Sequence, residues 1–470
     1  MAKELWARLL GEAWAALGGG ESGTELQVTG VRGSLPSHLP VEDTAIACAG
    51  AALLAAADLQ AQRGGPVSRT ARLDRGHVAA AFRSEAYLRL NGAAAGAGFA
   101  PLSRFWPARD GWVRTHGNYP WHREALVRAL GTGEDPDQVA AAIAGRAAHE
   151  VEDLVVGAGG VAAAVRTEAQ WRAEPAGQAV AAARLVEGGR VSQAPARRRA
   201  AGALAVLPAG ALPAAGIRVL DLTRVIAGPV ATRYLAALGA DVLRLDPPHR
   251  PELPHAYDGL LGKRSALLDL DLDGARFDEL LGAADVLVHG YRPHALERFG
   301  FTPAALAERH PGLVVVSLSA WGSAGPWGGR RGFDSIVQAA SGIAVAESAG
   351  GDRPGAMPCQ LLDHGTGYLC AAAALRGLAD QAVAGGTQVR ELSLARTAQW
   401  LLSSPTAGLT PTGSTGASGG RAGGDADWLT TLGSPEGAVT VVRPLGQLDG
   451  RELAWPAPLT RYGGDPPAWR

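Results

Sequence analysis

Between about residues 216 and 320, short apolar runs alternate with amphipathic helical segments at regular spacing. The apolar runs have the length and composition of buried strands, and they cover residues 217–222, 241–245, 286–288 and 313–318. The intervening helical patterns cover residues 229–238, 273–284 and 303–309. Strands that alternate with helices in this way form βαβ units, so we predict an α/β fold built on a parallel sheet with right-handed crossovers.

The composition of the flanks suggests a division of the chain into four parts. Residues 194–213 are rich in Ala, Pro and Arg, and a cluster such as Arg197–Arg199 is typical of a solvated linker. Residues 410–424 are rich in Gly, Ser and Thr, which favours a loop. We therefore predict an N-terminal part over 1–193, a linker over 194–213, a sheet domain over 214–350 and a C-terminal part over 351–470.

The chain also contains a candidate internal repeat. Asp43 and Asp363 each stand at the start of an Ala-rich helical pattern that leads to a Gly-Gly pair, an apolar strand-like run and a further helical run. Ala-rich helices can align by chance, but the order of elements favours a partial duplication. Between residues 109 and 179 the pattern is different and indicates a smaller α+β unit, with Thr167 as a helix cap.

Charge, cysteine and hydropathy patterns narrow the classes of function. Acidic and basic residues nearly balance, at a formal charge of −1, which argues against nucleic acid as a partner. The three cysteines have no metal-ligand or disulfide spacing, and this fits a reducing compartment without a bound metal. No signal peptide and no membrane-length apolar run are visible. We therefore expect a cytoplasmic protein with no membrane partner.

Recognisable sequence fragments occur in a fixed order over residues 216–402. They are IRVLDLTRVIAGP (217–229), LGADVLRLDPP (238–248), GKRS (262–265) with LDL (268–270), ADVLV (284–288) with YRP (291–293) and LERFG (296–300), GFD (332–334), SG (341–342) and LDHGTG (362–367). Each fragment alone is weak, but together and in this order they are specific. In them the chain resembles the family III, or CaiB/BaiF-type, CoA-transferases.

The resemblance implies a fold, an activity and a set of site residues. The expected fold is a Rossmann-like CoA-binding domain with a smaller α+β domain, and the expected reaction moves coenzyme A between an acyl-CoA and a small carboxylic acid. By resemblance Asp363 is the covalent nucleophile. The residues expected to bind CoA or to form the turn beside its acyl group are Arg224, Ile226, Ala227, Lys263, Tyr291 and Arg298. Arg292 is a further cation that could contact CoA. For each of the cations, a surface ion pair is the alternative.

Physical chemistry supports a carboxylate in the nucleophile's role. An aspartate can form a mixed anhydride and then a thioester, and both states keep the acyl group activated without ATP. Asp is also favoured as the N-cap of a helix, so a cap at Asp363 is the alternative interpretation, and the two roles are compatible. Ile226 stands where oxalate-specific members carry Gln, and an apolar side chain there cannot hydrogen-bond a second carboxylate. We therefore do not expect formyl or oxalate transfer.

Two other functions stay open. Related racemases use a His and an Asp on opposite faces of one carbon, but Phe333 occupies the position of that His, and His364 is a weak substitute. His116 is interpreted as structural. Alternatively the chain is a degenerate CoA-binding protein, because residues 43–180 resemble the family's Asp-bearing helix and small domain placed ahead of the sheet. Asp43, the counterpart of Asp363 in the candidate repeat, is interpreted as a relic cap, and the homodimer usual in the family stays an open expectation.

Overall fold

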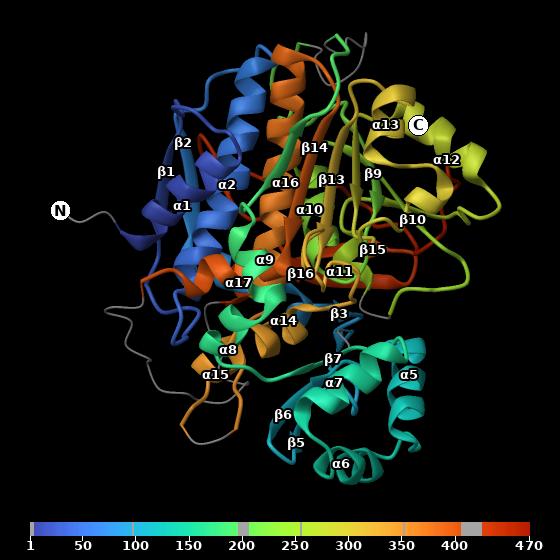
Figure 1. Ribbon diagram of the computed structural model, residues 1–470. Coiled ribbons are helices and arrows are strands. Elements are labelled where there is room, and N and C mark those ends of the chain that lie inside the picture. Colours follow the sequence, from blue (N-terminus) through green and yellow to red (C-terminus); the bar gives the residue numbers. More distant parts are fainter. Residues whose placement is uncertain (1–3, 96–97, 196–205, 254–255, 351–352, 406–424) are drawn as a thin grey trace.

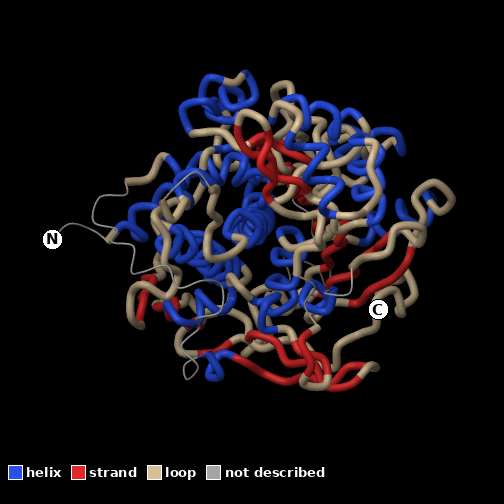
Figure 2. Tube along the Cα trace, turned by 90° about the horizontal axis from the view of Figure 1, so that it is seen from below, coloured by secondary structure: helices blue, strands red, loops and turns tan. Residues whose placement is uncertain are grey.

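The computed structural model describes residues 4–95, 98–195, 206–253, 256–350, 353–405 and 425–470. The Arg197–Arg199 cluster and the whole segment predicted as a loop over 410–424 lie outside the described residues. Figure 2 shows helices at the centre of the molecule, with strands around them.

A seven-stranded sheet forms the largest layer of the described structure, with the strand order β11-β10-β9-β12-β13-β14-β8. All neighbours are parallel except β8, which pairs antiparallel with β14 at one edge. The strands are β8 (Glu187–Arg190), β9 (Arg218–Leu222), β10 (Asp241–Asp246), β11 (Arg264–Leu267), β12 (Val286–His289), β13 (Val314–Ser319) and β14 (Gln388–Ser393). The predicted α/β fold with a parallel sheet is confirmed.

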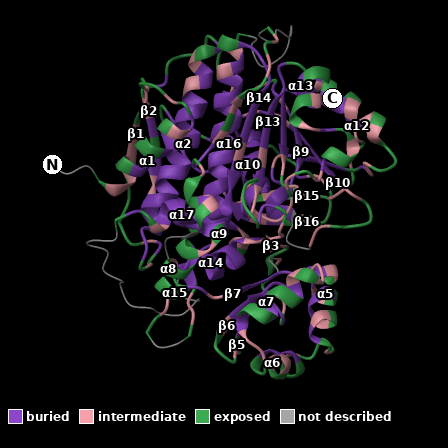
Figure 3. Cartoon of the chain, in the orientation of Figure 1, coloured by how far each residue is buried: buried purple, intermediate pink, exposed green. Residues whose placement is uncertain are grey.

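Helices cover both faces of this sheet because successive side chains of a strand point to opposite faces. In β9, Val219 joins the core formed with α10 (Ala227–Ala237) and α16 (Leu361–Ala384). Leu220 joins the core formed with α12 (Gly274–Ala283) and α13 (Pro303–Arg309) on the other face. Figure 3 shows that α10, α16 and the central strands are largely buried.

The N-terminal part packs against α16 through a second long helix, α2 (Val41–Gln62). Figure 1 shows α2 and α16 side by side, and both are rich in alanine, which lets their backbones approach closely. Among the described residues, α2 alone is long and apolar enough to cross a bilayer, but 89% of its most apolar window is buried inside the protein. It is a core helix of this fold.

A smaller unit over residues 105–164 has its own apolar core. It contains the antiparallel strands β5 (Phe105–Ala108), β6 (Gly111–Thr115) and β7 (Ala162–Ala164) and the helices α5 (Pro120–Leu130), α6 (Pro136–Ala144) and α7 (Ala148–Gly157). After it, α8 (Glu168–Ala173) begins with the predicted cap, because Thr167 and Gln170 form a reciprocal capping box.

Two further small sheets join the two ends of the chain. Strands from the first hundred residues pair with strands after residue 428 in the orders β1-β2-β17-β18 and β15-β16-β3-β4. The remaining elements are α1 (Leu5–Ala16), β1 (Glu25–Thr29), β2 (Thr70–Asp74), α3 (Arg75–Ala81), α4 (Ser84–Tyr87), β3 (Arg89–Leu90), β4 (Ala93–Ala94), α9 (Pro175–Ala182), α11 (Ala256–Leu260), η1 (Glu297–Phe299), α14 (Asp334–Ser341), α15 (Ile343–Ala346), α17 (Leu394–Leu402), η2 (Asp425–Trp428), β15 (Leu429–Ser434), β16 (Gly437–Val442), β17 (Gln447–Leu448) and β18 (Arg451–Glu452).

Candidate active site

Asp363 lies in the first turn of α16, two residues after the helix begins at Leu361. The interpretation of Asp363 as an N-cap is therefore wrong, since the N-cap position is Gln360. The first backbone N–H groups of α16 need an acceptor from outside that helix, and Asp334, the first residue of α14, provides one. Its Oδ2 accepts a hydrogen bond from the backbone N–H of Asp363 at 3.0 Å. Because another helix satisfies this donor, the Asp363 side chain is free to point elsewhere.

The Asp363 side chain lines a cavity of about 310 Å³ between the sheet domain and the N-terminal part. Its walls combine residues near the start of α10, α14 and α16 with residues from the first 119 positions of the chain. The lining residues are Glu85, Ala86, Arg89, Ala94, Gly98, Phe99, His116, Asn118, Tyr119, Val225, Ile226, Leu253, Phe333, Asp334, Ser335, Gln360 and Asp363. The structure therefore brings Asp363 and Ile226, both predicted from sequence, into one cavity.

Three carboxyl groups meet in this cavity and shape the ionisation of Asp363. Burial raises the pKa of Asp363 well above its ordinary value, and the negative charges of Asp334 and Glu85 raise it further. Burial also raises the pKa of Asp334 to about 6, against the hydrogen bonds that it accepts from Gln338 and Asp363. At neutral pH the Asp363–Asp334 pair therefore resists carrying two negative charges.

His116, which the sequence pattern led us to interpret as structural, lines the cavity of Asp363. The ring of His116 stacks on that of Phe333, with the ring centroids 3.7 Å apart. Phe333 occupies the sequence position at which the related racemases carry their His, so a histidine from another segment lies next to that position. Burial lowers its pKa to about 3, and His122 and Arg114 lower it further, so the imidazole is neutral. No local motif marks His116, because its place in the site depends on how the small unit packs on the sheet domain.

The turn between β9 and α10 forms another part of the cavity wall. Val225 has a φ of +68°, which is unusual for a β-branched residue and stores strain at this turn. Its backbone N–H donates to Glu252 Oε2 at 3.0 Å, which holds the turn in place. Ile226 follows and faces the cavity, whereas Ala227 is buried in the first turn of α10, where its carbonyl oxygen closely approaches Gly367 of α16.

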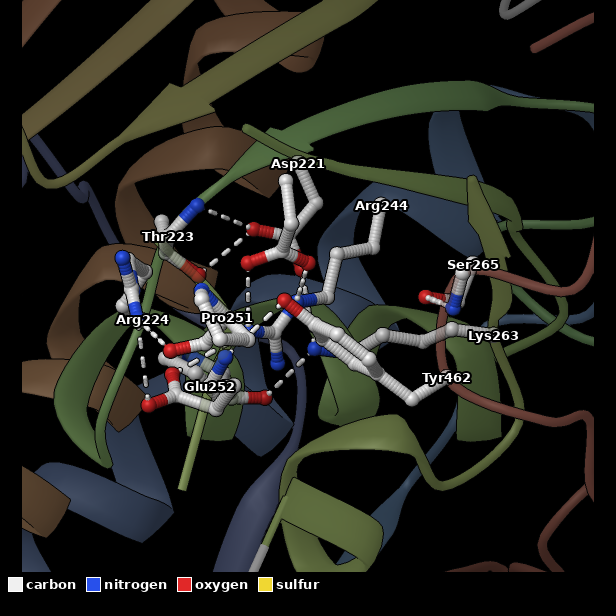
Figure 4. A network of polar contacts seen from close by, with 12 residues as sticks. Asp221, Thr223, Arg224, Arg244, Pro251, Glu252, Lys263, Ser265 and Tyr462 are labelled. Atoms are coloured by element: carbon white, nitrogen blue, oxygen red, sulfur yellow. Dashed lines mark hydrogen bonds and ion pairs between the residues drawn. The ribbon is translucent and has the colours of Figure 1, made fainter. Parts of the chain in front are cut away.

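A buried polar network lies behind this turn (Figure 4). Lys263 belongs to it: its Nζ donates to Asp221 Oδ2 at 2.9 Å and to the Pro229 carbonyl at 3.2 Å, and the Lys263 and Asp221 side chains are fully buried. Burial lowers the pKa of Lys263 to about 8, although the Asp221 charge opposes the shift. The structure thus gives the Lys263 ammonium an internal partner, and its expected contact with CoA phosphates stays a prediction.

Glu252 connects this network to the cavity wall. It accepts hydrogen bonds from Tyr119 Oη at 2.5 Å and from Arg244 at 3.2 Å, and it lies 3.6 Å from Arg224. Burial alone would raise the pKa of Glu252, but the Arg244 and Arg224 charges outweigh burial and lower it to about 2. Arg224, predicted as a site residue, also lies over the rings of Tyr119 and Trp121.

Three guanidinium groups act on His122 at the edge of the same region. Burial lowers the pKa of His122 to about 3, and the charges of Arg331, Arg250 and Arg224 lower it further. The pKa of Arg331 is itself lowered by burial and by Arg292 and Arg250, so these cations are close enough to repel one another. Sequence reasoning identified Arg224 and Arg292 but missed Arg250 and Arg331, which carry no recognisable local signal.

The other two predicted CoA contacts lie apart from Asp363. Tyr291 is half-buried and lines a separate cavity of about 400 Å³ at the ends of β12, β13 and β14. Arg298 is exposed in η1 and forms an ion pair with Asp271 at 3.2 Å. Neither residue lines the cavity of Asp363.

Asp43, the counterpart of Asp363 in the candidate repeat, lies in a different setting. It is the third residue of α2, not its cap, and its carboxylate is 3.4 Å from the guanidinium group of Arg32. The neighbouring Glu42 pairs with Arg75 at 2.9 Å. Asp43 is not among the residues that line the cavities described above, and within the described residues no three His, Cys, Asp or Glu side chains are grouped to hold a metal.

Comparison with known proteins identifies the sheet-bearing part of the chain. The sequence model of CoA-transferase family III matches residues 214–430. A probable fatty acyl-CoA transferase of Mycobacterium tuberculosis is 34% identical over 184 residues, which cover 36% of this chain and 47% of that protein. A formyl-CoA:oxalate CoA-transferase of Streptomyces coelicolor is 34% identical over 177 residues, covering 35% and 43%.

A longer match and a solved structure complete the comparison. An acyl-CoA transferase of Gibberella moniliformis is 31% identical over 307 residues, covering 60% of this chain and 53% of that protein. The crystal structure of a CaiB/BaiF family protein from Brucella suis aligns with a TM-score of 0.39 and 23% identity, covering 48% and 65%. The chain spans about half the length of the curated relatives it matches. The resemblance is confirmed: residues 214–430 match the sequence model of CoA-transferase family III.

Proposed function

We propose that this protein transfers coenzyme A between an acyl-CoA and a free carboxylic acid, with Asp363 as the covalent nucleophile. The observation that carries the proposal is the placement of Asp363 in a cavity whose wall includes Tyr119, with the guanidinium group of Arg224 lying over the Tyr119 ring. A carboxylate at such a place can receive an acyl group while the adjoining cations hold the phosphates of the same substrate.

The reaction takes four balanced steps. The Asp363 carboxylate attacks the thioester carbonyl, so that a mixed anhydride forms and CoA leaves as its thiolate. The thiolate attacks the aspartyl carbonyl, which gives an aspartyl–CoA thioester and releases the donor acid. The acceptor carboxylate then attacks this thioester and expels the thiolate again. In the last step the thiolate attacks the acceptor's acyl carbonyl, which yields the new acyl-CoA and restores Asp363.

The neighbours of Asp363 would tune the first step. Attack requires the ionised carboxylate, and the pKa of Asp363 is raised, so acylation should accelerate as the pH rises through the pKa of the Asp363–Asp334 pair. Asp334 would hold the nucleophile in position through the backbone N–H of Asp363. Neutral His116 and the ring of Phe333 would close one side of the acyl group.

We further propose that the seven-stranded sheet is the Rossmann-like module that binds CoA. Its six parallel strands run in the order β11-β10-β9-β12-β13-β14, with the chain reversing direction across the sheet between β9 and β12. Ligands of such sheets bind at the carboxyl ends of the strands beside this reversal. Arg224 follows β9 there, so we assign the CoA phosphates to the cluster of Arg224, Arg250, Arg292 and Arg331.

The N-terminal part would complete the site within one chain. We propose that α2, β2 and α3 are a partial copy of α16, β14 and α17, because the two sets follow the same order and their long helices pack together. The copy that carries Asp43 would be inactive, since the carboxylate of Asp43 pairs with Arg32 and does not line the cavity of Asp363. It leads into the segment that contributes Glu85 and His116 to the cavity of Asp363.

The direct test is a transfer assay with a panel of acyl-CoA donors and free acids, with the formation of the new acyl-CoA followed by chromatography. We expect transfer by the wild type, none by Asp363→Asn, and unchanged transfer by Asp43→Asn. Full transfer by Asp363→Asn would overturn the proposal.

His116 favours one second candidate, a 2-methylacyl-CoA racemase. A neutral imidazole and a carboxyl group in the same cavity are the two bases that such a reaction needs. Exchange of the α-proton with deuterated water, abolished by both His116→Ala and Asp363→Asn and unaccompanied by transfer to free acids, would establish this reaction instead.

A further inference from the structure

Glu85 is a carboxylate of the cavity that the proposed mechanism does not use. It belongs to the short helix α4 of the N-terminal part, and its side chain lines the same cavity as Asp363. Its Oε2 lies 3.0 Å from Nε2 of His364, which is fully buried behind it, while the Glu85 side chain keeps 27% of its surface exposed. Glu85 is therefore anchored from one side and open to the cavity on the other.

Around Glu85 the cavity combines carboxyl groups with apolar walls. Asp363, Asp334 and Glu85 supply three carboxyl groups, and the charge of Glu85 acts directly on the pKa of Asp363. The cation that lines the same cavity among the described residues is Arg89, and one of its terminal nitrogens donates to the carbonyls of Ala86 and Leu88.

The remaining walls cannot neutralise a second negative charge on a bound acyl group. They are formed mainly by the rings of Phe99, Tyr119 and Phe333 and by the side chains of Val225, Ile226 and Leu253. His116 is neutral because burial lowers its pKa to about 3. A second carboxylate in this cavity would have to share it with Glu85, at an electrostatic cost that grows in a poorly hydrated site.

We propose that Glu85 determines specificity by excluding acyl groups with a second carboxylate, so that the enzyme accepts acyl groups with uncharged, apolar ends. The proposal rests on the function proposed above and adds the class of substrate to it. A second negative charge within roughly 8 Å of Glu85 should slow acylation at least about tenfold at an effective dielectric constant of about 20.

Butyryl-CoA and succinyl-CoA test the proposal, because they have the same number of acyl carbons and differ by a terminal methyl or carboxylate. Acylation of Asp363 is measured with both thioesters in the full-length wild type, in Glu85→Gln and in Glu85→Asp. Glutamine keeps a hydrogen-bond partner for His364 but removes the charge, whereas aspartate keeps the charge. Glu124→Gln, at an exposed position of α5, is the matched control.

We expect the wild type, Glu85→Asp and Glu124→Gln to prefer butyryl-CoA at least about tenfold, and Glu85→Gln to lose most of that preference by gaining rate with succinyl-CoA. Thermal unfolding shows whether each variant is folded. An unchanged preference in folded Glu85→Gln, or a wild type that prefers succinyl-CoA, would overturn the role of Glu85 alone. If neither thioester acylates Asp363 in the wild type, the proposed function fails and this inference falls with it.

Discussion

Replacing Lys263 with methionine separates a structural role of this residue from a role in binding CoA. In the structure the Lys263 ammonium donates to Asp221 at 2.9 Å, and both side chains are fully buried. Methionine fills a similar volume but leaves the Asp221 carboxylate buried without its cation. Removing one partner of a buried ion pair typically costs about 3–5 kcal/mol.

The surroundings of Asp221 indicate which end of that range applies. Its carboxylate keeps hydrogen bonds from the Thr223 backbone N–H at 2.9 Å, the Thr223 hydroxyl at 2.5 Å and the Thr232 hydroxyl at 2.6 Å. The charge of Arg244 also favours the ionised form of Asp221, after the larger contribution of Lys263. These interactions stabilise the carboxylate in part, so we predict a loss of unfolding free energy of about 3 kcal/mol for Lys263→Met.

The assay combines urea unfolding, followed by circular dichroism, with calorimetric titration of CoA. The double variant Asp221→Asn, Lys263→Met is the control, since it removes both charges and should lose no more stability than Lys263→Met alone. If Lys263→Met unfolds like the wild type while its affinity for CoA falls tenfold, the ammonium binds phosphate and our reasoning about the buried pair is refuted.

Three further predictions concern Glu252, Gly367 and Asp334. The pKa of Glu252 is lowered to about 2 from an unfolded value of 4.5. The charge of Glu252 therefore stabilises the fold by about 3 kcal/mol above pH 4.5, and by progressively less as the pH falls toward 2. The difference in unfolding free energy between wild type and Glu252→Gln should shrink over that pH range. Gly367→Ala should lower the unfolding free energy by about 1–3 kcal/mol, because the added Cβ overlaps the carbonyl oxygen of Ala227. Asp334→Asn should shift the pH profile of acylation toward acid, because removing the Asp334 charge lowers the pKa of Asp363.

Each of these has a control or a contradicting result. Gly282→Ala, in α12, meets its nearest neighbouring atom at 3.9 Å and should stabilise its helix by up to about 1 kcal/mol; equal effects at Gly367 and Gly282 would contradict the packing argument. A difference between wild type and Glu252→Gln that grows in acid would contradict the charge assignment. If Asp334→Asn does not change the pH profile of acylation, the Asp334 charge does not influence the pKa of Asp363.

The sheet domain could be predicted because its signals are local. The helix over Pro303–Arg309 has the predicted bounds, and the strand predicted over 286–288 extends by one residue to His289. Apolar runs and turn residues determine such elements nearly by themselves. The start of α16 was misplaced because Asp334, from another helix, performs the capping that the sequence assigned to Asp363 itself.

The composition of the site could not be predicted in the same way. Glu85 and His116 come from segments far from Asp363 in sequence, and only the packing of the N-terminal part on the sheet domain brings them together. Lys263 belongs to a motif of the family, yet the motif does not reveal that Asp221 lies within reach of its ammonium. Burial and pairing of charges are tertiary properties, so they emerge only from the fold.

The most direct measurement is the site of covalent modification after the protein is incubated with an acyl-CoA and then with hydroxylamine. Our account predicts that peptide mass spectrometry finds one hydroxamate per chain, on Asp363, and that Asp43 stays unmodified. An acyl-CoA that is turned over while Asp363 remains unmodified, or a hydroxamate on another carboxyl group, would contradict the claim that Asp363 carries the acyl group.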